Sequence, residues 1–334
     1  MSWEISAEST DTIMKQSNII CALSYMELNK TFYINDSFNL HIDQWIEQIN
    51  NSNIDYVVIN GSDYAPPLDF DGLNYNQRIN KKIIYLNNKF THNNHYPFWL
   101  VNSITWAKQD TVDITAKKPY NIVCLNSKIR YTRLYVLYKL LKKSYIDTIK
   151  IAGGIESIDQ IFHEDDDRLG DQQLLFEEHH IAAKELISKF CDISGYCDFA
   201  TEEDKVKSIA QNMDTAYLQV VNESRPELSA FVSEKIFKPL RAGQLFLVHG
   251  SPGTINHLRQ LGFDVFDDHI DHNRYDNEPN WQKRADLMLA VLDDIHNNIE
   301  NIYYATTERR QYNIDLFKKS ELMDHVVAGI QRQL

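Results

Sequence analysis

Polar and charged side chains gather at three points where an apolar run gives way to a helical pattern. The first point follows Leu125 and carries Asn126, Arg130 and Arg133. Two arginines three residues apart lie on one face of a helix. A forked guanidinium beside the free amides of a helix start binds pyrophosphate well. This segment therefore predicts a phosphate site, with a solvated basic helix end as the alternative.

The second point is Ser233-Glu234-Lys235, which comes shortly after Asn222-Glu223-Ser224. Ser233 is a good N-cap for a helix whose first turn then offers a carboxylate and an ammonium group. The Glu234 carboxylate could accept hydrogen bonds from ribose hydroxyls, and the Lys235 ammonium could neutralise a phosphate. The alternative is that a Glu-Lys pair in a first turn only stabilises its own helix.

The third point is the turn His249-Gly250-Ser251-Pro252-Gly253, which follows an apolar strand and opens a helix. Glycines allow a ligand to approach the backbone closely, so Gly250 and Ser251 are candidate binding residues. Glycines also occur in ordinary turns, and that alternative stays open.

The hydrophobic periodicity around these points alternates between strand and helix, which predicts an α/β protein with parallel sheets. Ligands of such sheets bind beyond the carboxyl ends of the strands, where all three points lie. Strands are expected at 54–60, 82–86, 120–125, 148–152, 216–221, 245–248 and 263–266, and helices at 97–108, 130–143, 171–190, 234–241, 254–261 and from 281 onward.

Length and composition indicate a globular protein of two domains. The chain has 334 residues, of which 43% are hydrophobic and 24% charged, and no run approaches the ~20 apolar residues that span a bilayer. A polar stretch ending at Pro119 suggests a first domain at 1–115 and a second at 116–334. The first residues do not read as a signal peptide and the four cysteines form no extracellular framework, so we expect a cytoplasmic protein.

The net charge of −13 opposes nonspecific binding to nucleic acid, although a basic stripe runs through residues 117–150. Such a stripe inside an acidic protein suits a confined anionic ligand better than a long polyanion.

The block 231–237, followed by Ala242-Gly243 and by 248–252, resembles the donor-site signature of the alpha-1,3-fucosyltransferase family and its bacterial and viral relatives. Leu125-Asn126 with Arg130 and Arg133 is similar to the upstream basic motif of that group. The resemblance covers roughly residues 120–294 and is most specific in Ser233-Glu234-Lys235.

This resemblance implies a GT-B fold, in which two Rossmann-like domains face a cleft and helices at the C-terminus close the structure. It also implies an inverting transfer from a nucleotide-diphosphate sugar, such as a GDP- or UDP-sugar, with no obligatory metal. By motif, Arg130 and Lys235 would contact the donor phosphates, Glu234 the ribose, and Glu223 would lie near the sugar. The order Asn222-Glu223-Ser224 departs from the Glu-Asn-Ser order of the family, which affects the role of Glu223. The setting would be a bacterial or virus-infected cytoplasm.

An inverting transfer needs a carboxylate that takes the acceptor proton. Asp63, just beyond the strand that ends at Asn60, is the candidate base, and an ordinary turn residue is the alternative. The acceptor would be a glycan or glycolipid precursor, or a hydroxymethylated base in DNA as in phage DNA-modifying transferases. A third interpretation is a non-catalytic nucleotide-sugar-binding protein. The acids at 164–167 and the pair Cys191 and Cys197 are competing metal signals, which we consider weaker.

Overall fold

A computed structural model describes thirteen stretches of the chain, and the account below is confined to them. They are residues 31–35, 50–51, 56–60, 82–87, 96–107, 110, 112–128, 131–154, 215–224, 226–227, 232–319, 321–324 and 328. By its internal contacts the chain forms two compact units, one of residues 1–108 with 319–334 and one of 109–318. The second unit thus begins before the boundary expected at 115–116, and residues 319–334 group with the first unit.

The first unit contains a parallel sheet in the order β1-β2-β3-β4. The strands are β1 (Thr31–Asn35), β2 (Tyr56–Asn60), β3 (Lys82–Asn87) and the short β4 (Tyr96–Pro97), which leads into helix α4 (Phe98–Ala107). Aromatic and β-branched residues dominate β1 to β3, as is typical of strands in a parallel sheet. The two strands and the helix expected between residues 54 and 108 are confirmed.

The second unit is built on another parallel sheet, in the order β6-β5-β7-β8. Its strands are β5 (Tyr120–Lys128), β6 (Ile149–Gly154), β7 (Ala216–Asn222) and β8 (Leu245–His249). Every residue of β7 and β8 is buried, which is the pattern of strands covered on both faces. The chain is therefore a mixed α/β protein with parallel sheets, as the periodicity predicted.

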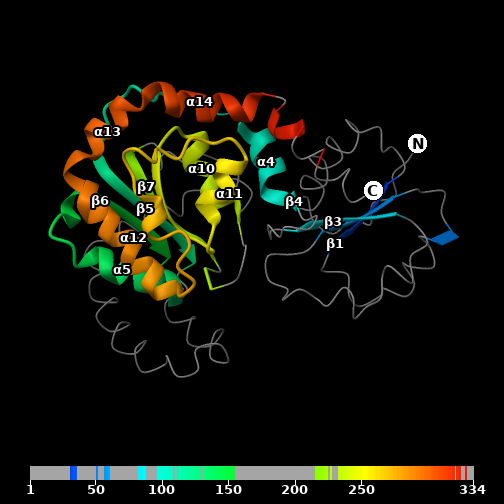
Figure 1. Ribbon diagram of the computed structural model, residues 1–334, viewed down its shortest axis with the longest axis horizontal. Helices are drawn as coiled ribbons and strands as arrows, with labels where there is room; N and C mark the ends of the chain where they lie inside the picture. The colour runs from blue at the N-terminus through cyan, green and yellow to red at the C-terminus, as the bar shows by residue number, and fades with distance from the viewer. Residues whose placement is uncertain are drawn as a thin grey trace. The chain divides into compact units, whose positions relative to one another are not determined.

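The helices of the second unit cover this sheet. They are α5 (Tyr131–Leu141), α10 (Glu234–Arg241), α11 (Thr254–Gln260), α12 (Trp281–Ile295), α13 (Ile299–Ala305) and α14 (Thr307–Lys318), with 3-10 turns at Ile146–Thr148, His272–Arg274 and His296–Asn298. Helix α12 packs on α5 and β8, whereas α10 packs on β7, β8 and α14. Figure 1 shows α12 beside α5 and α14 running past α10. Within the described residues, no helix combines the length and apolar character needed to cross a membrane.

The segment at 263–266, which we expected to be a strand, is not one. Phe266 has a left-handed backbone with φ of 63°, and its amide donates to the Asp264 carboxylate at 2.8 Å. Asn313 of α14 exchanges two 2.8 Å hydrogen bonds with the backbone of Asp264, so the groups that a neighbouring strand would use are occupied. The alternation of apolar residues reflects burial of this loop and not sheet pairing.

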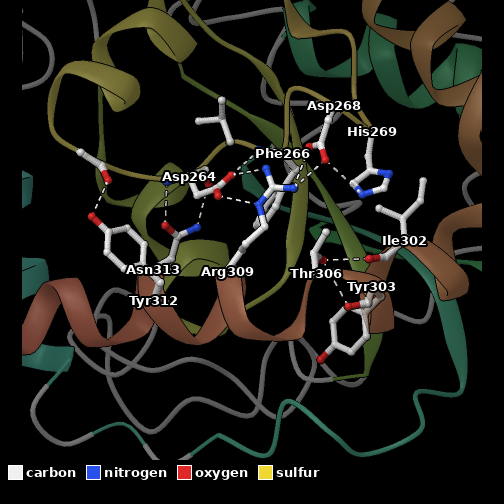
Figure 2. A network of polar contacts seen from close by, with 12 residues as sticks. Asp264, Phe266, Asp268, His269, Ile302, Tyr303, Thr306, Arg309, Tyr312 and Asn313 are labelled. Carbon is white, nitrogen blue, oxygen red and sulfur yellow. Dashed lines mark hydrogen bonds and ion pairs between the residues drawn. The ribbon is translucent and has the colours of Figure 1, made fainter.

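Arg309 connects α14 by hydrogen bonds to the loop that contains Asp264 and Asp268. Its guanidinium donates two hydrogen bonds to Asp264, at 2.6 and 2.7 Å, and one nitrogen lies 2.7 Å from Asp268, as Figure 2 shows. The Arg309 guanidinium also lies over the ring of Phe266, 5.4 Å from its centre. Helix α14 is thereby held against the loop that leads from α11 to α12.

Candidate active site

The order of the strands makes the carboxyl ends of β5 and β7 a candidate binding site. The connection from β5 through α5 leads to β6 on one side, and that from β7 through α10 leads to β8 on the other. The strand order therefore diverges between β5 and β7, which pair with each other in parallel. Ligands of open parallel sheets bind at such a switch point, beyond the carboxyl ends of the strands. The predicted residues Asn126, Glu223 and Gly250 lie at or just beyond the carboxyl ends of three neighbouring strands.

Two buried asparagines meet at the switch point. The Nδ2 of Asn222, at the end of β7, donates to the Oδ1 of Asn126 in β5 at 3.3 Å. Both side-chain amides also lie 3.4 Å from the sulfur of Cys124, which is buried and forms no disulfide. The predicted residue Asn126 is thus brought to the expected place, where it couples β5 to β7.

Glu223 holds the start of α10. It follows β7, is fully buried, and its backbone amide donates to the carbonyl of His249 at 3.0 Å. Its carboxylate accepts from the backbone amide of Ser233 at 3.1 Å and from the Ser233 hydroxyl at 2.6 Å. Burial raises the pKa of Glu223 above its usual range, although Lys235 and the bonds from Ser233 act in the opposite direction. Ser233 caps α10 as predicted, with its Oγ accepting from the amide of Lys235.

Lys235 and Glu234 form an ion pair at the first turn of α10. The Nζ of Lys235 donates to Glu234 at 2.9 Å and to the Oγ of Ser233 at 3.1 Å. Burial would raise the pKa of Glu234, but the charges of Lys235 and Lys238 outweigh it and lower that pKa to about 2. The Lys235 side chain is 24% exposed, so part of it is open to solvent.

Arg133 reaches this cluster from α5. It is almost fully buried and its Nη2 donates to the hydroxyl of Ser224 at 2.7 Å, which links α5 to the segment after β7. Its charge acts on Lys235 and opposes protonation of that amine, although burial and the two glutamates have larger effects on the Lys235 pKa, which is raised overall. Arg133, Glu223, Ser233, Glu234 and Lys235, which the sequence singled out, therefore lie together.

The backbone groups of the turn after β8 and of the start of α11 are packed against, or hydrogen-bonded to, other residues of the protein. A Cβ at Gly250 would lie 3.0 Å from the Oγ1 of Thr254 and 3.0 Å from the Cγ1 of Val248, which is tighter than an ordinary contact, so this glycine allows the turn to pack closely. The backbone oxygen of Ser251 accepts from the Thr254 hydroxyl at 2.7 Å. The Asp276 carboxylate accepts the amides of Ile255 and of the next residue at 2.9 and 3.1 Å, and so satisfies the start of α11. Ligand binding by Gly250 and Ser251 stays a prediction, and both residues have structural roles.

Arg284, which the sequence did not single out, and His249 of the third polar point fix the loops at the carboxyl ends of these strands. Arg284 of α12 is buried and donates to the carbonyls of Gly250, Glu278 and Pro226. Burial lowers the pKa of Arg284 to about 10 even though nearby acids favour its charge. His249 bonds the carbonyl of Trp281 at 3.0 Å through Nε2. An arginine inside a helical pattern gives no local signal that it binds three distant carbonyls.

Some predicted residues lie outside the described part of the chain. These are the candidate base Asp63, the candidate phosphate ligand Arg130, and the competing metal signals at 164–167 and at Cys191 and Cys197. Within the described residues, no group of three or more His, Cys, Asp or Glu side chains is placed to hold a metal ion.

Comparison of the chain with protein-family models, with curated proteins and with solved structures finds no match.

Proposed function

We propose that the protein is an inverting glycosyltransferase of the GT-B type that transfers a sugar from a nucleotide diphosphate to a hydroxyl group. The observation that carries this proposal is the group of cations at the switch point of the second sheet. Arg133, Lys235 and Lys238 act on one another or on Glu234 there, and Lys235 is partly exposed. A diphosphate is the anionic ligand that parallel α/β sheets most often bind at this place.

The charges of the cluster favour an anion without a metal. The described carboxylates in it are Glu223 and Glu234, against the three cations named above. An excess of positive charge in a poorly hydrated site is costly unless an anion compensates it. Side chains could therefore stabilise the leaving nucleoside diphosphate directly, so turnover should survive EDTA. Loss of turnover in EDTA, restored by manganese or magnesium, would contradict this part.

The two glutamates have different proposed roles. Glu234 is ionised, as its lowered pKa requires, and can accept hydrogen bonds from ribose hydroxyls. Glu223 has both oxygens bonded to Ser233, so we assign it to positioning the first turn of α10. The acceptor hydroxyl would attack the anomeric carbon opposite the departing diphosphate and lose its proton to a carboxylate. Asp63 is the residue proposed for that proton.

A glycan or glycolipid precursor is the proposed acceptor in preference to hydroxymethylated DNA. Duplex DNA would need the basic residues of α5 at the binding edge, because phosphate contacts must overcome the acidic total. Lys139 and Lys143 instead pair with Asp286 and Asp293 of α12, at 3.2 and 2.6 Å. Lys139 lies in the last turn of α5 and Lys143 lies just beyond its end, whereas Arg133, near the start of α5, reaches the switch point.

A thermal-shift panel tests the proposal. UDP, GDP, CDP, dTDP and their sugars would be compared, since a ligand of the native state raises the unfolding temperature with the logarithm of saturation. At least one nucleoside diphosphate and its sugar should stabilise the protein. The active donor would then be offered with an oligosaccharide pool and with hydroxymethylcytosine duplex across a salt series. Transfer to the glycan at all salt concentrations supports the proposal, and transfer to duplex that salt suppresses would favour the DNA alternative. Donor binding without transfer to any acceptor would favour a non-catalytic binding protein.

A further inference from the structure

Two buried side chains at the ends of neighbouring strands each keep an acceptor atom without a donor. Asn222 is the last residue of β7 and His249 is the last residue of β8, and they are 2% and 0% exposed. Within the described part of the chain, no donor reaches the Oδ1 of Asn222 or the Nδ1 of His249. Buried polar atoms of native proteins nearly always have a partner, so these two need a physical explanation.

The bonds made by the other atoms of each side chain show which atom is left over. The Nε2 of His249 lies 3.0 Å from the carbonyl oxygen of Trp281, which can only accept, so Nε2 carries the proton and Nδ1 is an acceptor. Burial lowers the pKa of His249 to about 3, which keeps the ring neutral. The Nδ2 of Asn222 donates to Asn126 at 3.3 Å and to the sulfur of Cys124 at 3.4 Å, so its Oδ1 is the remaining acceptor.

The two acceptors belong to adjacent residues at the candidate site. Asn222 and His249 are register partners in the parallel pair of β7 and β8, so their side chains leave the same face of the sheet from strands about 4.8 Å apart. Glu223 follows Asn222 directly, and its amide donates to the carbonyl of His249 at 3.0 Å. The carboxylate of Glu223 in turn accepts from Ser233, which caps the helix of Lys235. The pair therefore borders the charged cluster at the carboxyl ends of the strands.

We propose that Asn222 and His249 form a hydroxyl-binding pair, which accepts hydrogen bonds from two neighbouring hydroxyl groups of the nucleotide sugar. This inference depends on the proposed function, because the nucleotide sugar supplies the hydroxyl groups. Phosphate oxygens of a diphosphate have no hydrogen to donate, so they do not fit two acceptors. Sugars carry hydroxyls on adjacent carbons and supply two donors close together. The ribose and the transferred sugar share this chemistry, and the experiment separates the two.

A site that accepts a hydrogen bond from a hydroxyl discriminates against a ligand without it, because the acceptor then stays buried and unpaired. Calorimetry would compare UDP and GDP with their 2′-deoxy and 3′-deoxy forms, and with UDP-glucose and GDP-mannose. If the ribose occupies the pair, a deoxy form should bind the wild type about tenfold or more weakly than its parent. If the transferred sugar occupies it, loss of the pair should weaken a nucleotide sugar about tenfold more than its nucleotide.

Two substitutions of His249 separate its acceptor from its donor. His249→Gln keeps an N–H for the carbonyl of Trp281 but has no acceptor at the place of Nδ1, so it should lose the discrimination. His249→Asn keeps an acceptor near that place and loses the distant donor, so it should retain the discrimination. Asn222→Ala should lose it as well.

Gln219 provides the matched control. It lies in β7 three residues before Asn222, so its side chain leaves the opposite face of the sheet. It is also buried, and its Oε1 has no donor among the residues that the structure describes. Gln219→Leu should discriminate between the ligands as the wild type does, because its acceptor does not border the candidate site.

The possible results lead to different conclusions. The same discrimination in wild type, His249→Gln and Asn222→Ala, as an internal water bound to the pair would give, overturns the pair and leaves the proposed function standing. Wild-type protein that binds nucleotides, with no effect of removing either ribose hydroxyl or of adding either sugar, does the same without any variant. No binding of any of these ligands to a wild-type protein that unfolds cooperatively overturns both. Thermal unfolding of each variant checks that the fold is kept.

Discussion

The carboxylate of Glu223 accepts two hydrogen bonds from Ser233, one from its backbone amide at 3.1 Å and one from its hydroxyl at 2.6 Å. Through this contact the end of β7 fixes the start of α10. The same serine accepts from the Nζ of Lys235 at 3.1 Å, so the position of the Lys235 ammonium depends on Glu223.

Replacement of Glu223 by alanine should therefore destabilise the protein. The variant leaves a buried amide and hydroxyl without their acceptor, which costs about 2–3 kcal/mol in the free energy of unfolding. Glu223→Gln keeps the shape and one acceptor oxygen and should lose less. Urea unfolding measures both, with Glu308→Ala on the exposed face of α14 as a control that changes stability by less than about 0.5 kcal/mol. An alanine variant as stable as the control would show that the hydrogen bonds between Ser233 and Glu223 contribute nothing to the free energy of unfolding.

Two glycines with left-handed backbones offer a matched test of packing against strain. Gly243 has φ of 57°, and a Cβ there would lie 2.7 Å from Ile114 and 2.8 Å from Ile314. Gly253 has φ of 80° and nothing within 4 Å of a Cβ. Gly253→Ala should cost only the backbone strain, about 1–2 kcal/mol, whereas Gly243→Ala adds an overpacking cost of about 1–3 kcal/mol. Equal losses in chemical denaturation would contradict the packing around Gly243.

His272 should make the second unit sensitive to acid. Its Nε2 lies 2.8 Å from the carbonyl of Val265, which can only accept, so Nε2 carries the proton and Nδ1 accepts from the hydroxyl of Tyr275 at 2.6 Å. Burial lowers the pKa of His272 to about 4. The stabilisation from the neutral ring is complete above the unfolded pKa of 6.5 and is lost as pH falls toward about 4, at ~1.4 kcal/mol per pH unit.

His272→Gln removes this titration. Its unfolding free energy should therefore depend less steeply on pH between about 6.5 and 4.5 than that of the wild type, although the variant is less stable at neutral pH. Tyr275→Phe deletes the hydroxyl and keeps the histidine, so it should retain the acid sensitivity. The same pH slope in His272→Gln and wild type would refute the assignment.

The regular elements of the second unit could be predicted because their local signals agree with the fold. Helix α10 was predicted with the bounds observed, Glu234–Arg241, since Ser233 caps its start and Gly243 takes a left-handed backbone just after its end. The strands β5 to β8 were also expected, with ends that differ by a few residues. Strand β1 (Thr31–Asn35) was not expected, although its aromatic and β-branched residues are followed by the turn-forming residues Asp36 and Ser37.

What the sequence could not predict depends on contacts between distant segments. Residues 263–266 alternate in hydrophobicity like a strand, yet Asn313, 49 residues after Asp264, hydrogen-bonds to the backbone amide and carbonyl of Asp264. No local sequence pattern indicates that the Asp276 carboxylate accepts backbone amides at the start of α11. Nor does any indicate that Arg284 donates to three backbone carbonyls in separate loops. Lys238 looks like an ordinary helix residue until its burial beside Glu234 is known. The three polar points were predicted from local patterns, but their internal bonding was not.

The binding of UDP and GDP to wild type and to Lys235→Ala, measured by calorimetry, tests the central claim most directly. We predict that at least one nucleotide binds the wild type and that the substitution weakens it by about 1.5–3 kcal/mol, or roughly 10- to 150-fold in Kd. Lys283→Ala, which removes an exposed ammonium on α12, should leave the affinity unchanged. Equal affinity in wild type and Lys235→Ala, or no binding of either nucleotide to the folded wild type, would contradict the account.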